Sequence, residues 1–262
     1  MTSPSPPERF DEASLTDDAV LGGRLSVWQP HDGYRAGVDP VFLAAAVAAR
    51  PGETVLELGC GVGVASLCLM ARVPGLWLTG VELQPAYAAL AARNAQRNGM
   101  AMQVVAGDIT RMPPEVRDQS FDHVITNPPY YLRRDGTPAS DRGREQALGE
   151  ETPLSAWIDA ALRRLAPGGC LTVIQRADRL ADLLGDLSPR AGAIEIRPLA
   201  PRLSRDATRV IVIAKKGAKT PLRLAPPMIL HEGAAHTEDR DSYTSAAAAV
   251  LRDGHAWPWV GD

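Results

Sequence analysis

Thr54-Val-Leu-Glu-Leu-Gly-Cys-Gly-Val-Gly63 is the stretch that decides the fold of this 262-residue chain. Its first five residues are mostly apolar, which predicts a buried strand over 54–58. Three glycines then alternate with other small residues, and the residues that follow predict a helix to about Arg72. At the first strand-to-helix turn of an open α/β sheet, glycines let the backbone approach a nucleotide ligand closely. The stretch therefore predicts an α/β fold with a ligand site at this turn.

Strands and helices alternate after this turn. Residues 85–98 are rich in alanine and end at Gly99, which predicts a helix, and apolar residues at helical spacing predict a second one over 154–165. We expect a further helix over 179–187. The further strands that we expect are 76–81, 102–106, 121–126, 170–174, 193–197 and 209–214. Such alternation is typical of a parallel sheet with helices on both faces. The last two strands have no helix between them and should form an antiparallel edge hairpin, so we expect a seven-stranded, mostly parallel sheet.

The ends of the chain are expected to be appendages of one domain, residues 21–262. Residues 1–20 are rich in proline, serine and acidic residues, which is typical of a disordered tail. Residues 21–50 include an apolar helix and form a segment before the sheet. Residues 220–262 follow the last expected strand and form a C-terminal appendage.

Composition argues against several classes of protein. The longest apolar run has nine residues, 41–49, which is far short of the roughly 20 needed to cross a bilayer. The N-terminus has no basic start followed by an apolar stretch, so we expect a cytoplasmic protein. Three cysteines without a Cys-x-x-Cys pair, and histidines without ligand spacing, predict no metal site.

The charge distribution is uneven. The net charge of −3 gives no overall attraction to nucleic acid. Between Arg190 and Arg223, however, nine basic residues stand against only Glu195 and Asp206. Such a segment is either an ordinary solvent-exposed surface or a basic surface that binds a polyanion such as nucleic acid.

Three acidic residues stand at or near the ends of the first three sheet strands. Glu82 closes the second strand and is placed to accept both hydroxyls of a ribose, and Asp108 can accept from an adenine amino group. Glu57 lies two residues before the glycine turn, where a carboxylate would repel a phosphate but attract a cation. The glycine turn itself contains no basic residue. The pattern favours a cationic nucleoside such as S-adenosylmethionine (SAM) over a dinucleotide.

These residues resemble those of the class I methyltransferases, which have a Rossmann-like fold. In that resemblance residues 55–63 correspond to the cofactor loop, residues 80–82 to the second-strand acid and residues 107–109 to the adenine contact. The resemblance implies SAM as the cofactor. The cofactor-binding residues that we expect in and beside these segments, together with Asn127 further along the chain, are Glu57, Gly59, Gly61, Gly63, Glu82, Leu83, Gly107, Asp108 and Ile109.

The sequence Asn127-Pro128-Pro129-Tyr130 follows the expected strand 121–126 and resembles the catalytic motif of amino-directed methyltransferases. An exocyclic amine or amide nitrogen is a poor nucleophile because its lone pair is delocalised. The Asn127 side-chain oxygen and the Pro128 carbonyl can each accept one of its N–H groups and so aim that lone pair. The prolines stiffen the loop, and Tyr130 offers a planar surface for stacking.

The segment 29–44 is similar to the N-terminal signature of bacterial tRNA adenine-N6 methyltransferases, which modify the adenosine beside the anticodon of a valine tRNA. In that family the segment covers the cofactor, which adds Tyr34, Gly37 and Asp39 to the expected cofactor site. The resemblance implies a tRNA substrate. Beside the motif and in the basic segment, the arginines that could meet phosphates are Arg133, Arg134, Arg142, Arg144, Arg202 and Arg205.

Other functions share the same motif. Glutamine methylation of protein release factors uses Asn-Pro-Pro-Tyr, and guanine-N2 methylation of rRNA uses variants of it. The glutamine group usually carries a helical N-terminal domain, whereas only about 20 residues precede Gly22 here. A binding protein without activity would have no use for Asn127. The oligomeric state stays open.

Overall fold

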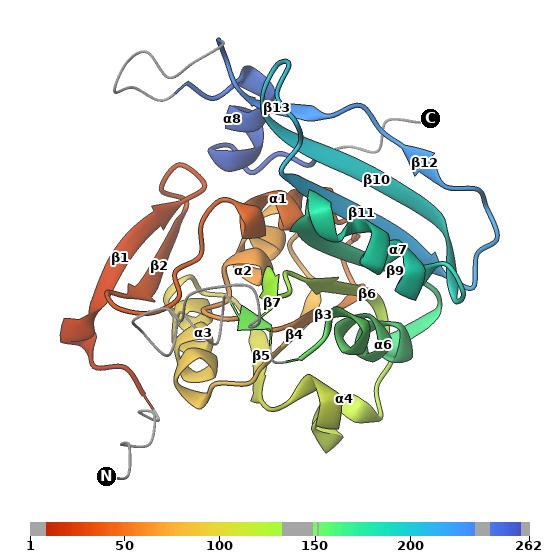
Figure 1. Ribbon diagram of the computed structural model, residues 1–262. Coiled ribbons are helices and arrows are strands. Elements are labelled where there is room, and N and C mark those ends of the chain that lie inside the picture. Colours follow the sequence, from red (N-terminus) through yellow and green to blue (C-terminus); the bar gives the residue numbers. More distant parts are fainter. Residues whose placement is uncertain (1–8, 133–148, 151, 234–241, 258–262) are drawn as a thin grey trace.

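The computed structural model describes residues 9–132, 149–150, 152–233 and 242–257 (Figure 1). Its helices are α1 (Asp39–Ala46), α2 (Val64–Arg72), α3 (Pro85–Arg97), α4 (Pro114–Arg117), α6 (Leu154–Arg164), α7 (Leu180–Leu187) and α8 (Ser245–Leu251), with 3-10 turns at Glu12–Ser14, Ile109–Arg111 and Ala177–Arg179. The strands before the catalytic motif are β1 (Leu15–Val20), β2 (Leu25–Pro30), β3 (Thr54–Leu58), β4 (Trp77–Glu82), β5 (Met102–Ala106) and β6 (Phe121–Thr126). Those after it are β7 (Tyr131–Leu132), β8 (Gly149–Glu150), β9 (Leu165–Arg176), β10 (Ala191–Arg202), β11 (Arg209–Lys216), β12 (Arg223–Leu224) and β13 (Met228–His231).

The central sheet confirms the predicted fold class. Strands β5, β4, β3, β6 and β9 are neighbours in that order and run parallel. Strand β11 then pairs antiparallel with both β9 and β10, which is the expected hairpin. Two short strands that the sequence analysis missed, β12 and β13, extend the sheet by pairing parallel with β10. All five parallel strands therefore end at one edge of the sheet, called the carboxyl edge below.

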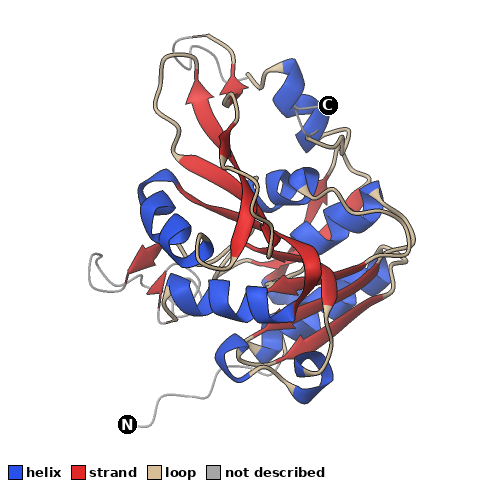
Figure 2. Ribbon diagram, turned by 90° about the vertical axis from the view of Figure 1, so that its right-hand side faces the viewer, coloured by secondary structure: helices blue, strands red, loops and turns tan. Residues whose placement is uncertain are grey.

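Helices cover both faces of the sheet (Figures 1 and 2). The core on one face contains apolar side chains of α1, α2, α3 and α8, and the core on the other face contains those of α4, α6 and α7. Most residues of β3, β4 and β6 are buried, because helices cover both faces of these central strands. This three-layer packing fixes the loops at the carboxyl edge.

The N-terminal region corrects one expectation. Residues 15–20 are not a disordered tail, because they form β1 and pair antiparallel with β2. This hairpin packs on α3, where the buried Asn94 side chain accepts from the Trp28 backbone N–H at 2.8 Å and donates to the Trp28 carbonyl at 3.0 Å. The pairing and this tertiary contact order a segment whose exposed acidic residues gave no clear strand pattern.

The C-terminal region returns to the domain instead of standing apart from it. The Trp257 backbone N–H donates to the Ala45 carbonyl at 2.8 Å, and the Trp257 ring packs edge-on against Phe42 of α1. The buried Arg197 side chain donates to the Trp257 carbonyl at 2.6 Å and pairs with Glu195 at 2.6 Å. Trp257 therefore links α1 to β10 through these contacts. Within the described ranges, no helix is long and apolar enough to span a membrane.

Candidate active site

A pocket opens at the carboxyl edge, beyond the ends of β3, β4, β5 and β6. The sequence places glycines, acids and the Asn-Pro-Pro-Tyr motif in these loops, and the parallel sheet brings them together. None of the described residues that line the pocket is basic. They are Tyr34, Ala36, Pro40, Glu57, Gly59, Cys60, Gly61, Val62, Val64, Ala65, Glu82, Leu83, Gln84, Tyr87, Asp108, Ile109, Asn127, Pro129, Thr152 and Trp157.

The floor of the pocket is the glycine turn, where side chains would not fit. Gly59 has a φ of +68°, and a Cβ there would lie 2.7 Å from the ring of Trp157. Gly61 has a φ of +54°, and a Cβ there would lie in ordinary contact with the Tyr34 ring, at 3.6 Å. Both positions need the left-handed backbone that glycine adopts readily. The turn thus brings backbone N–H and C=O groups close to whatever the pocket holds.

All three predicted acids line the pocket, and two of them, Glu82 and Asp108, lie at or just after the ends of strands. The Glu82 carboxylate accepts from the backbone N–H groups of Gly61 and Gln84, both at 2.9 Å, so it is fixed in place. Burial raises the pKa of Glu82. Asp108 accepts from the backbone N–H and the hydroxyl of Thr110, both at 2.8 Å. Each carboxylate keeps free acceptor capacity for hydroxyl or amino donors of a ligand.

The third acid, Glu57, is buried beneath the glycine turn. It accepts from the backbone N–H of Ser66 at 3.1 Å and from the Ser66 hydroxyl, in the first turn of α2. Burial raises the pKa of Glu57 to about 8, although the Ser66 hydrogen bonds oppose that rise. A cation in the pocket would favour the ionised form, since opposite charges attract strongly where water is excluded.

We expect the substitution Glu57→Gln to make the protein more stable at alkaline pH. A carboxyl whose pKa is raised from 4.5 to about 8 by folding stays protonated in the folded state while it ionises in the unfolded state. Folding stability therefore falls as the pH rises through this window, by at most about 1.4 kcal/mol per pH unit. Gln keeps an acceptor for Ser66 and has no proton to lose.

Urea unfolding at pH 5 and pH 8.5 checks this expectation. The free energy of unfolding of the variant, relative to that of the wild type, should be higher at pH 8.5 than at pH 5. Equal losses in both proteins between the two pH values would show that Glu57 ionises normally in the fold. Burial raises the pKa of Glu82 as well, so that residue lowers the stability of both proteins as the pH rises.

The loop after β6 carries an unsatisfied acceptor. The Thr126 hydroxyl donates to the Leu58 carbonyl at 3.0 Å, which ties the end of β6 to β3 beside the glycine turn. The buried Gln175 side chain of β9 donates to the Pro129 carbonyl at 3.4 Å. Between these anchors, the Asn127 side-chain oxygen is buried and has no hydrogen-bond partner among the described residues. A buried acceptor without a donor is costly, so this oxygen is available for a donor from a ligand.

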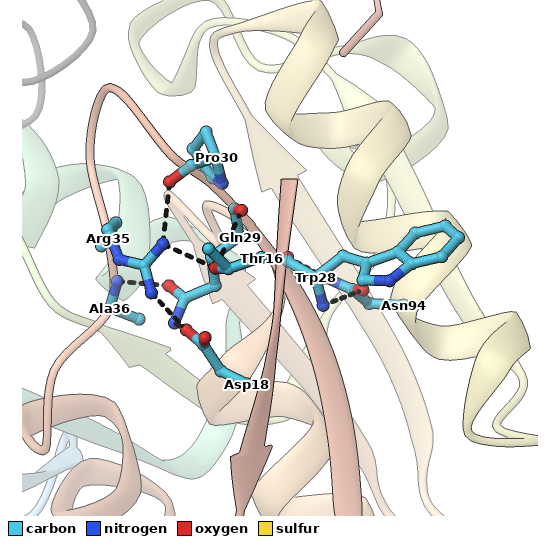
Figure 3. Close-up of polar contacts among 8 residues, drawn as sticks. All are labelled: Thr16, Asp18, Trp28, Gln29, Pro30, Arg35, Ala36 and Asn94. Atoms are coloured by element: carbon cyan, nitrogen blue, oxygen red, sulfur yellow. Dashed lines mark hydrogen bonds and ion pairs between the residues drawn. The ribbon is translucent and has the colours of Figure 1, made fainter. Parts of the chain in front are cut away.

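A polar network ties the loop 31–38, which supplies Tyr34 and Ala36 to the pocket wall, to β1 and β2 (Figure 3). Arg35 pairs with Asp18 of β1 at 2.6 Å and donates to the Thr16 hydroxyl at 2.7 Å. Gln29 of β2 accepts from the backbone N–H of Ala36 at 2.7 Å. On the pocket side, the Tyr34 backbone N–H donates to the Tyr87 hydroxyl at 2.9 Å. The hairpin β1–β2 therefore positions the segment that carries Tyr34.

The structure brings most of the predicted site together. Tyr34, Glu57, Gly59, Gly61, Glu82, Leu83, Asp108, Ile109, Asn127 and Pro129 line the pocket, whereas Gly37, Asp39, Gly63, Gly107, Pro128 and Tyr130 do not. Gly63 instead starts α2 with a φ of +91°. Gly107 packs against Pro113, where a Cβ would lie 2.2 Å from the ring. These two glycines shape the loops beside the pocket.

Trp157 is the main site residue that the sequence analysis missed. It belongs to α6, and its ring packs on Gly59 while its indole N–H is buried without a partner in the described part of the chain. The helical spacing of residues 154–165 predicts the helix but gives no sign that Trp157 faces the glycine turn. That contact arises only when α6 packs on the sheet.

The basic segment does not form one patch. Arg197 is buried and paired, and Lys215 and Lys219 lie at the edge opposite the pocket. Arg202 ends β10 and the exposed Arg205 lies in the β10–β11 turn, at the carboxyl edge, because Arg209 lies opposite Arg176 at the end of β9. Arg133, Arg134, Arg142 and Arg144 lie outside the described residues.

Comparisons with known proteins identify the class that this fold and pocket define. Residues 36–187 match the model of the methyltransferase small domain, and the chain belongs to that family. Its fold is that of the class I methyltransferases: a predicted O-methyltransferase from Agrobacterium tumefaciens has a TM-score of 0.67 at 28% identity and covers 83% of this chain and 97% of its own. The T. thermophilus 16S rRNA N2 G1207 methyltransferase, in complex with AdoMet and guanosine, has a TM-score of 0.55 at 19% identity and covers 77% of this chain and 50% of its own.

Sequence relatives confirm the narrower resemblance. A tRNA1(Val) (adenine(37)-N6)-methyltransferase of Porphyromonas gingivalis is 34% identical over 61% of this chain and 66% of its own length. A protein of the same name from Shewanella baltica is 31% identical over 69% of this chain and 77% of its own. A release factor glutamine methyltransferase of Geobacter sulfurreducens is 32% identical, but over 51% of this chain and 49% of its own. The chain spans slightly less than two thirds of the P. gingivalis relatives that it matches.

Proposed function

We propose that this protein transfers a methyl group from SAM to the exocyclic N6 amine of an adenosine in tRNA, beside the anticodon of a valine tRNA. The observation that carries the proposal is the buried, partnerless oxygen of Asn127 at a pocket lined by three carboxylates. The pocket offers an acceptor for an amine and a negative environment for a cationic cofactor.

The residues present fit SAM. Glu82 is fixed by two backbone N–H groups at the end of β4, where it would accept both ribose hydroxyls. Asp108 would accept from the adenine amino group, and Leu83 and Ile109 supply apolar walls. Glu57 would face the positive charge of the methionine end, and the glycine turn leaves room for the backbone to approach. Among the lining residues that the structure describes, no lysine or arginine opposes a cation.

The chain's own residues would supply positioning rather than proton transfer. When bound, SAM provides a methyl group on a positively charged sulfur, which is a good leaving group. Asn127 would accept one N–H of the target amine through its free oxygen, and the Pro128 carbonyl would accept the other. Holding the nitrogen in this way aims its lone pair at the methyl group, and such orientation accounts for much of the rate of bimolecular transfers. The described residues hold no cluster suited to a metal ion.

Adenosine in tRNA is favoured as the substrate over glutamine in a release factor and guanine in rRNA. The reason is how far the similarity to each kind of enzyme extends along the sequence. The match to the S. baltica tRNA enzyme covers 77% of that relative, against 49% for the release factor enzyme. The rRNA guanine enzyme is similar in fold at 19% identity. The segment 29–44, which carries the tRNA-type signature, holds Tyr34 over the glycine turn.

The proposal is tested by incubating the protein with methyl-labelled SAM and either tRNA or a release factor. We expect label in N6-methyladenosine of valine tRNA, and none in a transcript whose adenosine beside the anticodon is replaced by guanosine. Label in the release factor, or in guanine of rRNA, with none in tRNA would overturn the substrate assignment. No transfer to any of them would overturn the activity itself.

We also expect the β10–β11 turn to contact RNA. The double substitution Arg202→Glu and Arg205→Glu should weaken tRNA binding and reduce the slope of log affinity against log salt by about one per lost phosphate contact. The double substitution Lys215→Glu and Lys219→Glu makes the same change of charge at the opposite edge and should leave both quantities unchanged. Filter binding over a range of salt concentrations measures them. If both variants showed the same tRNA affinity and the same salt dependence, the turn would not be an RNA contact.

A further inference from the structure

Tyr130 of the Asn-Pro-Pro-Tyr motif is held by two residues far from it in sequence. Its hydroxyl donates to the Asp39 carboxylate at the start of α1. The Arg209 guanidinium, at the start of β11, donates to the same Asp39 oxygen at 3.2 Å. The guanidinium also lies over the Tyr130 ring, 4.4 Å from its centroid. The three side chains thus form a closed set, in which each contacts the other two.

This arrangement restricts what Tyr130 can do. Arg209 covers one face of the ring, so at most the other face is left for a planar substrate. Burial and the neighbouring Asp39 carboxylate raise the pKa of Tyr130, so its hydroxyl stays protonated and serves as a donor to Asp39. With the hydroxyl and one face engaged, the ring can neither rotate freely nor accept a proton from the substrate. A preorganised ring loses less entropy when a base stacks on it.

Like Tyr130, Asp39 and Arg209 lie outside the pocket wall. Their side chains are only 23% and 28% exposed, so the pair is partly buried beside the motif. Because it engages both the hydroxyl and one face of Tyr130, it restricts the orientation of that ring.

We propose that Asp39 and Arg209 are positioning residues that fix the Tyr130 ring so that one defined face receives the target base. This inference rests on the proposed function, since it assigns a role in base placement. It gives Asp39 a task different from the cofactor contact that the family resemblance implies. It also connects the catalytic loop to the N-terminal segment and to the antiparallel hairpin.

The test is a double-mutant cycle on turnover. Asp39→Ala should lower kcat on tRNA by about tenfold, with the SAM dissociation constant unchanged, because the ring loses its orientation. In a Tyr130→Phe background, which keeps the ring but lacks the hydroxyl, the same substitution should lower kcat by less than about threefold. Arg209→Ala should resemble Asp39→Ala, and Arg209→Lys should recover only part of the loss because an ammonium lacks the planar group.

A readout that does not depend on turnover is base stacking. Transfer RNA with 2-aminopurine at the target position should show strong fluorescence quenching with wild type and weaker quenching with Asp39→Ala or Arg209→Ala. Asp182→Ala removes a surface ion pair with Arg179 on α7 and serves as the matched control, with wild-type turnover and quenching. Thermal unfolding of every variant identifies any that fail to fold.

Two results would overturn the inference. The first is equal loss of kcat from Asp39→Ala in the wild-type and Tyr130→Phe backgrounds, with unchanged quenching. The second is weaker SAM binding by Asp39→Ala, which would return Asp39 to the cofactor site. Both results are measured against a wild-type protein that methylates tRNA. If the proposed function were wrong, the wild-type protein itself would transfer no label to tRNA, so the two failures can be told apart.

Discussion

Replacing Asn127 with alanine is expected to lower kcat by at least about 10²-fold, the size of loss seen when an enzyme loses one electrostatic contact that it makes in the transition state. The Asn127 oxygen is buried and has no partner among the described residues, so its free acceptor has no other use in the fold. Its side chain lies at the pocket but on the β6 loop, apart from the acids expected to hold the ribose and adenine. The SAM dissociation constant should therefore barely change. Single-turnover kinetics and calorimetry on the same preparation measure the two quantities.

Asn127→Asp is the matched variant, because it keeps an acceptor oxygen at the same place while losing the amide donor. It should retain more activity than the alanine variant. Near-wild-type turnover by Asn127→Ala would remove Asn127 from the chemistry, whatever the substrate is. A large loss of SAM affinity would instead make it a cofactor residue.

Replacing Glu82 with alanine should weaken SAM binding by about 10- to 100-fold, the cost of losing hydrogen bonds to a charged group. Glu82 holds two backbone N–H groups of the pocket floor and is buried at the end of β4. Its loss removes the acceptor for the ribose and leaves those N–H groups unpaired. Isothermal calorimetry with SAM and with S-adenosylhomocysteine measures the effect.

The two ligands provide the control for this prediction. Both carry the ribose, so Glu82→Ala should weaken SAM and S-adenosylhomocysteine by the same factor. Glu57→Gln should weaken SAM more than S-adenosylhomocysteine, because only SAM carries the sulfonium charge. Unchanged affinity of Glu82→Ala for both ligands would refute its ribose role.

The elements that the sequence predicts well are those with strong local signals. Strand 54–58 and helix α3 match their expected bounds to within a residue, because a buried apolar run precedes a glycine turn in one case, and Pro85 and Gly99 bracket alanines in the other. Strand β1 was missed because its stability comes from pairing with β2 and packing on α3. Strands β12 and β13 are too short to have a pattern of their own.

The residues of the candidate site also differ in whether the sequence could predict them. Residues in the strand-end loops could be found from sequence, since parallel strands end at one edge whatever the details of packing. Trp157 could not, because its place on Gly59 depends on how α6 lies on the sheet. The contacts of Tyr130 with Asp39 and Arg209 span 91 and 79 positions, and no local pattern encodes separations of that size.

The long separation of Asp39 and Arg209 has a consequence for biosynthesis. These two residues are 170 positions apart and meet on Tyr130, so the ring acquires both partners only after most of the chain has left the ribosome. The Arg209 strand must also insert between β9 and β10 before it can reach Asp39. A nascent chain can thus complete its glycine turn early while its tyrosine lacks one partner. Translation itself would then delay the onset of activity until the last sheet strands are in place.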